Sequence, residues 1–327
     1  MYAAARNLRG GVARRAAQLR GQGIIEYVLI IAIIGLVIVF AGPSVAGAIR
    51  NQFNLVGNTV NSGATGGVEG GGASGGGSAG TGSATVQAAI AKDPKDWTLN
   101  DQKAVAEDIA AKGEASPAYA KAKAAMDAGT KFSMKLTNGE TMEYKIIGIN
   151  HDDLADGSGK AGLTFLTTST HIWERMNVEG VSNVKGWQES KMRLEMNSGK
   201  IWNLLPVELQ TKIKPATKLT NNSDGYNGNA AITATTDKLF LLSNSEIVPT
   251  SAWDRGQPWI SSEGAQYEAF KGKGNACLQI GDRWWERSVR PTDFSGHGFF
   301  SYVSEEGWAN TTLHGWNGAA ICPAFCF

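Results

Sequence analysis

Two segments near the C-terminus have the residue types of a binding surface. Residues 293–297 read Asp-Phe-Ser-Gly-His, and residues 308–317 combine two tryptophans with a histidine and small polar side chains, without a helical or strand period. Rigid aromatic rings beside small, adaptable polar groups are typical of a surface that recognises a ligand. The predicted contact residues are Asp293, Phe294, Ser295, His297, Ser301, Tyr302, Trp308, Asn310, Thr311, Thr312, His314 and Trp316.

Burial is the competing interpretation for these tryptophans. All ten tryptophans of the chain follow residue 96, and buried tryptophan is the usual case in a folded domain. Trp308 and Trp316 could therefore belong to the core beneath two surface loops. Exposure of the two indoles decides between the alternatives.

Other groups capable of chemistry form no recognised constellation. The four histidines lack metal-ligand spacing, and no nucleophile elbow, P-loop or dinucleotide fingerprint is present. Asp152, Asp153 and Asp156 form an acidic, glycine-rich turn that could hold Ca²⁺, although it lacks the alternating acids of an EF-hand loop. Neither Glu-Pro-Asn nor Gln-Pro-Asp, the sugar motifs of calcium-dependent lectins, occurs. We expect a solvated turn, no cofactor and no enzymatic activity.

Charge and cysteine content narrow the class of protein. The chain has 327 residues with 31 Lys and Arg against 30 Asp and Glu, a net charge of +1 that argues against nucleic acid as a partner. Five arginines and no acid fall within residues 1–21, which leaves a net charge of −4 for residues 22–327. In an exported protein Cys277 could form a disulfide with Cys322 or Cys326, and one thiol would remain.

An apolar segment follows the arginine-rich start. Residues 24–41 contain one charged side chain, Glu26, and nearly reach the length needed to span a bilayer. A carboxylate at membrane depth is costly and usually marks function. A plain anchor with a tolerated glutamate, or a signal peptide cut near residues 46–48, are the alternatives.

The N-terminal residues resemble a type IV prepilin. A basic leader, then Gly21, Gln22, Glu26 and Tyr27 ahead of an apolar segment, is similar to the Flp (type IVb, tight-adherence) pilins. The resemblance implies that a prepilin peptidase cuts after Gly21, which makes Glu26 the fifth residue and Pro43 the twenty-second. Gln22 departs from the Phe or Met common elsewhere at that position, and a cut after Gly23 would break the pattern. Other pilin subunits, and the membrane before assembly, are then the expected partners.

The remaining chain divides by composition. We expect a leader at residues 1–21, an apolar helix at 22–61, a Gly-rich linker at 62–85, a short helical segment at 86–129 and a globular head at 130–327. Two short helices should fill residues 86–129, the first starting near Thr98-Leu99 and the second near Ser116-Pro117. They could open the head or form a spacer.

The head is expected to be β-rich. A hairpin at residues 131–149 turns at Asn138-Gly139, and further strands are predicted at residues 163–167 and 238–242. Residues 186–202 and 206–213 fit helices. In the first of them Met192, Leu194 and Met196 should be partly buried.

The head also resembles a known group of domains. Gly186-Trp187 with Ser190, residues 236–243, residues 284–288 and the C-terminal residues 320–327 are similar to an uncharacterised domain family common in gut Firmicutes. That resemblance implies a C-type-lectin-like fold, shared with formylglycine-generating-enzyme-type domains and with variable proteins of diversity-generating retroelements. It assigns a scaffold role to Trp284, Trp285, Arg287, Pro323, Ala324 and Phe325.

The predicted class is therefore α+β, with a long N-terminal pilin-type helix, a tether and a β-rich C-type-lectin-like head. The predicted function is a pilin-like subunit at the cell surface whose head binds a protein or glycan ligand. A membrane-anchored exported enzyme with a formylglycine-generating-like head and a purely structural pilin are the alternatives.

Overall fold

The computed structural model describes residues 83–169, 172–178, 186–222, 232–249, 263–290, 299–309 and 311–327. All of them belong to the unit formed by residues 75–327. The predicted leader, apolar helix and most of the linker lie outside the described residues, and so do Gly21, Gln22, Glu26, Tyr27 and Pro43.

Three helices, not two, open the described part of the chain. They are α2 (Ala84–Ala91), α3 (Leu99–Lys112) and α4 (Tyr119–Asp127). The predicted start of α3 is confirmed by a capping box, in which Thr98 Oγ1 accepts from the Asp101 N–H and Asp101 Oδ2 accepts from the Thr98 N–H. Pro94 follows α2 and begins the short 3₁₀ helix η1 (Pro94–Asp96), which separates α2 from α3.

These helices are part of the head's core. Trp97 stacks on Phe132 of the first strand at 6.4 Å between ring centroids, and the Tyr144 hydroxyl and the Gln102 side chain form a 3.2 Å hydrogen bond. A Cβ added at Gly162 would lie 1.8 Å from the Ala106 carbonyl oxygen, so only glycine permits this approach of α3 to the sheet. The helices therefore open the head and are not a spacer.

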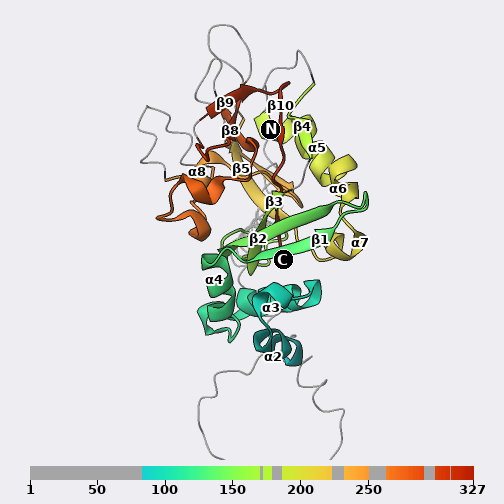
Figure 1. Cartoon of the computed structure of the whole chain (residues 1–327), viewed down its shortest axis with the longest axis vertical. Helices are drawn as coiled ribbons and strands as arrows, with labels where there is room; N and C mark the ends of the chain where they lie inside the picture. Colours follow the sequence, from blue (N-terminus) through green and yellow to red (C-terminus); the bar gives the residue numbers. More distant parts are fainter. Residues whose placement is uncertain are drawn as a thin grey trace, which may run out of the picture. The chain divides into compact units, whose positions relative to one another are not determined.

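The first sheet has four strands in the order β1-β2-β3-β11. Figure 1 shows β1 and β2 as neighbouring strands. The predicted hairpin is confirmed, with a turn in which Gly139 takes a φ of +87°. The C-terminal strand pairs antiparallel with β3 and completes the sheet. The strands are β1 (Lys131–Lys135), β2 (Thr141–Ile149), β3 (Leu163–Ser169) and β11 (Ala324–Cys326).

The second sheet has five strands in the order β4-β10-β7-β8-β9. Trp284 and Trp285 begin β7 and are both buried, which confirms their predicted scaffold role, as does the burial of Arg287, Ala324 and Phe325. The strands are β4 (Trp173–Arg175), β7 (Trp284–Arg290), β8 (Phe299–Val303), β9 (Thr311–His314) and β10 (Gly318–Ala320). A separate two-stranded ribbon is formed by β5 (Ala216–Asn221) and β6 (Ile232–Asp237).

The helix predicted at residues 186–202 is broken into three pieces. They are η3 (Gly186–Glu189), α5 (Lys191–Asn197) and α6 (Lys200–Leu204). Ser190 caps a new helix because its Oγ accepts from the Arg193 N–H, and Gly199 separates α5 from α6. Met192 and Met196 are buried as predicted, whereas Leu194 is 63% exposed. The helix predicted at residues 206–213 is shorter, α7 (Val207–Gln210).

The strand predicted at residues 238–242 is not formed, although the burial predicted for this segment is confirmed. Leu239 to Leu242 are all buried, yet only Phe240 forms a bridge, with Ala324. Two further carbonyls of this segment accept from Arg287, Leu241 O from its guanidinium and Leu242 O from its backbone N–H. A side chain thus replaces part of a strand ladder before α8 (Asn244–Ile247) begins.

The predicted fold class is wrong for the described residues. They contain 33% helix and 30% strand, a mixture of helices and sheets, and no long N-terminal helix is among them. The longest helix among them, α3, has 14 residues, and none in the described ranges is long and apolar enough to cross a membrane.

Candidate functional site

The β8–β9 hairpin carries a ladder of stacked rings. Its register places Phe299 opposite His314, with their ring centroids 4.3 Å apart. His314 also stacks on Trp316, at 4.4 Å and an interplanar angle of 6°. All three side chains are half-buried, and β9 is the edge strand of its sheet. The ladder is therefore partly covered by the protein, and part of its aromatic surface is open to solvent.

The turn that joins β8 to β9 presents the most exposed tryptophan of the described residues. Trp308 is 56% exposed, so the interpretation of Trp308 as a core residue is wrong. Its backbone is held in place: Ser304 N–H donates to Trp308 O at 2.9 Å, and Ser304 Oγ accepts from the N–H groups of Glu306 and Trp308. The indole is consequently exposed on an ordered backbone.

The same turn is fastened to the rest of the domain. Gly307 takes a φ of +83°, and a Cβ added there would lie 2.1 Å from the Asn275 carbonyl oxygen. Next to Trp308, the Ala309 carbonyl accepts from the Asn244 side-chain amide at the start of α8. Both contacts are long-range in sequence. They position the turn independently of the indole.

The structure separates the predicted contact residues into two groups. Trp308 lies at the turn, whereas His314 and Trp316 lie toward the opposite end of the hairpin, together with Phe299, which the sequence analysis missed. In the sequence, Phe299 and Phe300 are neighbours, and adjacent residues of a strand face opposite sides of a sheet. One of the two rings therefore had to point away from the core, and the structure shows that Phe300 is the buried one.

The remaining predicted contacts differ in accessibility. Tyr302, Thr311 and Thr312 are half-buried, and Thr311 Oγ1 donates to Tyr302 O at 2.6 Å. Ser301 is buried, which leaves little of its side chain for a ligand. Asp293, Phe294, Ser295, His297 and Asn310 lie outside the described residues.

The acidic turn at residues 152–156 uses its carboxylates for contacts within the protein. Asp153 pairs with Lys160 at 3.0 Å, and Asp156 Oδ1 accepts from the Ser158 N–H at 2.9 Å. Asp152 is buried and points into the domain. Within the described ranges no group of three or more His, Cys, Asp or Glu side chains is arranged to hold a metal ion.

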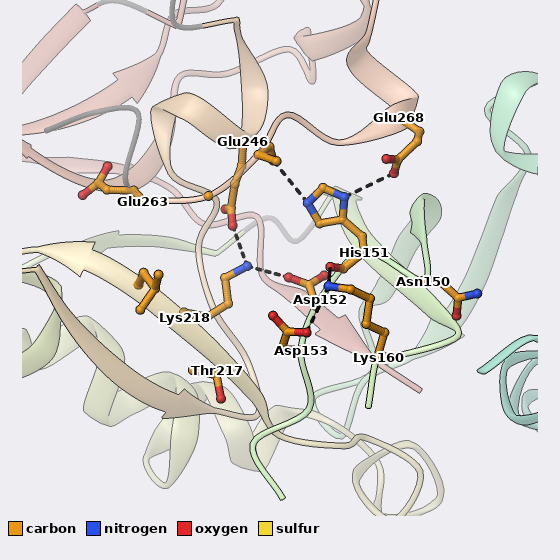
Figure 2. A pocket seen from close by; sticks show the side chains of 13 residues that line it. Asn150, His151, Asp152, Asp153, Lys160, Thr217, Lys218, Glu246, Glu263 and Glu268 are labelled. Carbon is orange, nitrogen blue, oxygen red and sulfur yellow. Dashed lines mark hydrogen bonds and ion pairs between the residues drawn. The ribbon is translucent and has the colours of Figure 1, made fainter. Parts of the chain in front are cut away.

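Asp152 belongs to a buried charged cluster beside an open pocket of about 310 Å³ (Figure 2). Lys218 on β5 contacts Asp152 Oδ1 at 2.6 Å and Glu246 Oε1 at 2.5 Å. Arg287 on β7 contacts Glu246 Oε2 at 2.5 Å. We define the buried charged cluster as Asp152, Lys218, Glu246, Glu263, Tyr267 and Arg287.

Burial and ion pairing shift the pKa values of these groups in different directions. Burial raises the pKa of Glu263 to about 7, against the opposing charge of Arg287. Burial also opposes the charge of Asp152, but Lys218 outweighs it and the pKa of Asp152 falls to about 2. In the same way the charge of Arg287, followed by that of Lys218, overcomes burial and lowers the pKa of Glu246. Near neutral pH, Asp152 and Glu246 are therefore ionised.

The three cysteines are unbridged in the structure. Cys322 and Cys326 are buried, and burial raises the pKa of both thiols well above the ordinary value. The pKa of the half-buried Cys277 is also raised by burial. A thiol held in its neutral form is a poor nucleophile, so none of the three has the surroundings of a reactive cysteine.

Comparison with known families covers this same part of the chain. Residues 161–327 match a family model described as Domain of unknown function (DUF6273). The chain belongs to this family. The DUF6273 match includes the β8–β9 hairpin, Lys218, Glu246 and Arg287, and it begins after Asp152. No curated protein and no solved structure matches the chain.

Proposed function

We propose that this protein is a surface-displayed binding subunit whose DUF6273 domain engages a protein or glycan ligand through the β8–β9 hairpin. The observation that carries the proposal is Trp308, which is 56% exposed on a turn whose backbone is fixed by hydrogen bonds. An exposed indole offers a large, rigid and amphipathic contact area to a ligand. Held in advance, it loses little conformational entropy when a ligand covers it.

The Phe299–His314–Trp316 ladder extends this surface along the hairpin. Stacked rings provide flat apolar area that suits the face of a sugar ring or an apolar side chain of a protein. Trp308 and the ladder lie toward opposite ends of strands of four to five residues. A ligand that contacts both must span roughly 10–15 Å at about 3.3 Å per residue. An extended oligosaccharide or peptide fits that requirement better than a small metabolite.

Display at the surface is the second part of the proposal. It rests on the likeness of residues 21–27 to a prepilin processing site, with Glu26 available to pair with the new N-terminal amine of a neighbouring subunit. Mass spectrometry of the mature protein tests it, since processing predicts a chain that starts at Gln22. Glu26→Ala should prevent filament assembly and leave the domain folded. An N-terminus elsewhere, or filaments unaffected by the substitution, would contradict this part.

The binding part is tested with the full chain in detergent on an array of immobilised glycans and extracellular proteins. Trp308→Ala should lose binding at every spot that the wild-type chain occupies. Leu194→Ala is the matched control, because Leu194 is 63% exposed on α5 and its removal also deletes exposed apolar surface. Equal binding by the wild type and Trp308→Ala, or equal loss in both variants, would overturn the assignment of the site.

A further inference from the structure

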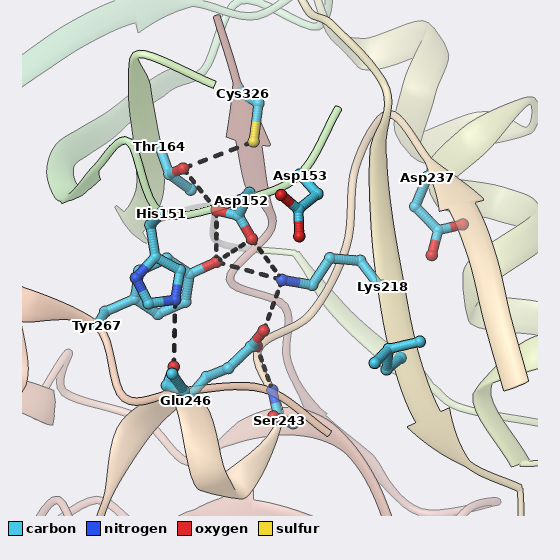
Figure 3. Close-up of polar contacts among 12 residues, drawn as sticks. His151, Asp152, Asp153, Thr164, Lys218, Asp237, Ser243, Glu246, Tyr267 and Cys326 are labelled. Carbon is cyan, nitrogen blue, oxygen red and sulfur yellow. Dashed lines mark hydrogen bonds and ion pairs between the residues drawn. The ribbon is translucent and has the colours of Figure 1, made fainter. Parts of the chain in front are cut away.

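Lys218 is a buried amine with two carboxylates as its closest polar partners. Its Nζ lies 2.6 Å from Asp152 Oδ1 and 2.5 Å from Glu246 Oε1, and the three side chains are at most 4% exposed (Figure 3). The rings of Phe240 and Tyr267 enclose the ammonium group, with centroids 4.3 and 5.7 Å from Nζ. An amine and a carboxyl group are thus held in contact in an almost dry site.

This contact meets the requirements of a condensation reaction. Holding a nucleophile against its target replaces a bimolecular encounter with an intramolecular step, which lowers the barrier. A second carboxylate within hydrogen-bond distance of the amine can carry its proton. Glu246 occupies that position.

We propose that Lys218 and Asp152 become joined by an intramolecular isopeptide bond between Lys218 Nζ and Asp152 Cγ, with Glu246 as the proton carrier. The bond is a modification of the domain itself and is independent of ligand binding by the hairpin.

The step balances without an oxidant, a reductant or a co-reactant. Burial alone would lower the pKa of Lys218, but the charges of Asp152 and Glu246 raise it, so the amine starts as an ammonium ion. Nζ first passes one proton to Asp152 Oδ1, which leaves a neutral amine against a neutral carboxylic acid, and the Nζ lone pair attacks Asp152 Cγ. Glu246 then takes a second proton from Nζ and delivers it to the Oδ1 hydroxyl. This hydroxyl leaves as water, and a neutral amide replaces the ion pair.

The hydrogen bonds of Asp152 distinguish its two oxygens. Oδ2 accepts from Thr164 Oγ1 at 2.6 Å, and the Tyr267 hydroxyl lies 2.8 Å from Oδ2 and 2.9 Å from Oδ1. These donors stabilise the negative charge that forms on Oδ2 during attack, as in an oxyanion hole. Oδ1 lies against the ammonium group, the source of both protons, and is therefore the oxygen that leaves. The adjoining pocket gives the released water a way out.

Asp152, and not Glu246, is the acyl partner because their other contacts differ. Glu246 Oε2 is bound by the Arg287 guanidinium and by the Ser243 N–H. A permanent positive charge at that oxygen keeps Glu246 a carboxylate and makes it a poor electrophile. Asp152 receives only neutral donors besides Lys218 and faces no guanidinium.

The bond would tie β5 to the loop between β2 and β3, across 66 residues of chain. A cross-link that closes a long loop reduces the conformational entropy of the unfolded chain. It would also replace three buried charges by a neutral amide and one carboxylate already paired with Arg287. Replacing a buried ion pair by neutral groups is often neutral or stabilising, so the site can accept the product.

Peptide mass spectrometry of the full wild-type chain tests the proposal directly. Trypsin should release residues 146–160 joined to residues 213–238 as one branched peptide, lighter by one water than the sum of its parts and uncut at Lys218. Separate, unmodified peptides after prolonged incubation of the folded chain would overturn the proposal. A branch between residues 213–238 and residues 239–255, which contain Glu246, would overturn the choice of Asp152.

Three variants sharpen the result. Lys218→Arg should abolish the branched peptide. Asp152→Asn should still form it, but with loss of one ammonia, because an amide has a different leaving group. Glu246→Gln keeps the shape and removes the proton carrier, so it should reduce the yield of the branched peptide many-fold. An unchanged yield in Glu246→Gln would contradict the role of Glu246.

Discussion

The turn around Trp308 and the buried charged cluster both hold side chains in fixed positions, but they do so in opposite surroundings. At the turn, backbone hydrogen bonds and the approach of Gly307 to Asn275 fix the chain and leave the indole 56% exposed. In the cluster, side chains fix one another, and Arg287 is fully buried. The turn should therefore tolerate loss of its exposed side chain, whereas the cluster should not tolerate loss of one charge.

Arg287→Met should have the largest effect on stability. It removes the partner of Glu246, together with donors to the carbonyls of Leu241 and Glu263. Breaking a buried ion pair by deleting one member typically costs about 3–5 kcal/mol. Urea denaturation of the full chain measures the loss. The control is Lys131→Met, which removes the exposed 2.8 Å pair with Glu143 and should cost far less. Similar losses in both variants would mean that the cluster is no more dependent on pairing than the surface.

Glu263→Gln should change the pH dependence of stability. Burial raises the pKa of Glu263 from 4.5 to about 7, so the folded state binds a proton that the unfolded state has released between these values. Stability from this group is complete below pH 4.5 and is lost as the pH rises through 7. The variant cannot ionise and should show a shallower decline between pH 5 and 8, by up to about 3 kcal/mol. Denaturation midpoints across that range measure it, and an unchanged slope would contradict the shift.

Gly307→Ala should disturb the turn from its backbone. The new Cβ would meet the Asn275 carbonyl at 2.1 Å, in addition to the strain of a φ of +83°. We expect a loss of about 1–3 kcal/mol together with weaker ligand binding. Gly272→Ala is the matched control, because Gly272 has a φ of +69° and nothing lies within 4 Å of its added Cβ. If both variants lose the same stability, the contact with Asn275 does not hold the turn.

Trp308→Ala should have the smallest effect on stability, within about 0.5 kcal/mol, because the indole is exposed and the turn is held by other groups. Its effect on binding should be large, on the order of 2 kcal/mol or more for a central aromatic contact. Thermal unfolding and array binding are measured on the same preparation. A marked loss of stability would show that Trp308 contributes to packing, and it would contradict the contrast between the turn and the buried charged cluster.

Local patterns predicted the elements that depend on neighbours in sequence. The hairpin at Asn138-Gly139, the capping box at Thr98 and the strand from Leu163 were all readable, because turn and cap chemistry lies within a few residues. The prediction of a strand at residues 238–242 was wrong. The apolar run of this segment correctly predicts burial but cannot reveal that the Arg287 guanidinium, more than forty positions away, takes the place of a neighbouring strand.

The candidate site shows the same division. The residue types at positions 308–317 predicted an unusual surface, but not which aromatic ring is exposed, which joins a stack, or that Phe299 completes the ladder. Those outcomes depend on strand register and on contacts with Asn275 and Asn244, which local composition does not encode.

The amino-acid sequence alone determined the locations of several turns, caps and buried segments, and it singled out the aromatic C-terminal region. It also predicts a processing site near Gly21, which stays a prediction. Tertiary structure alone decided that Asp152, Lys218 and Glu246 meet. Each of the three is an ordinary charged residue in sequence, and they come from a loop, a strand and a short helix. Their meeting depends on folding contacts between distant segments, and burial there turns three common side chains into one coupled site.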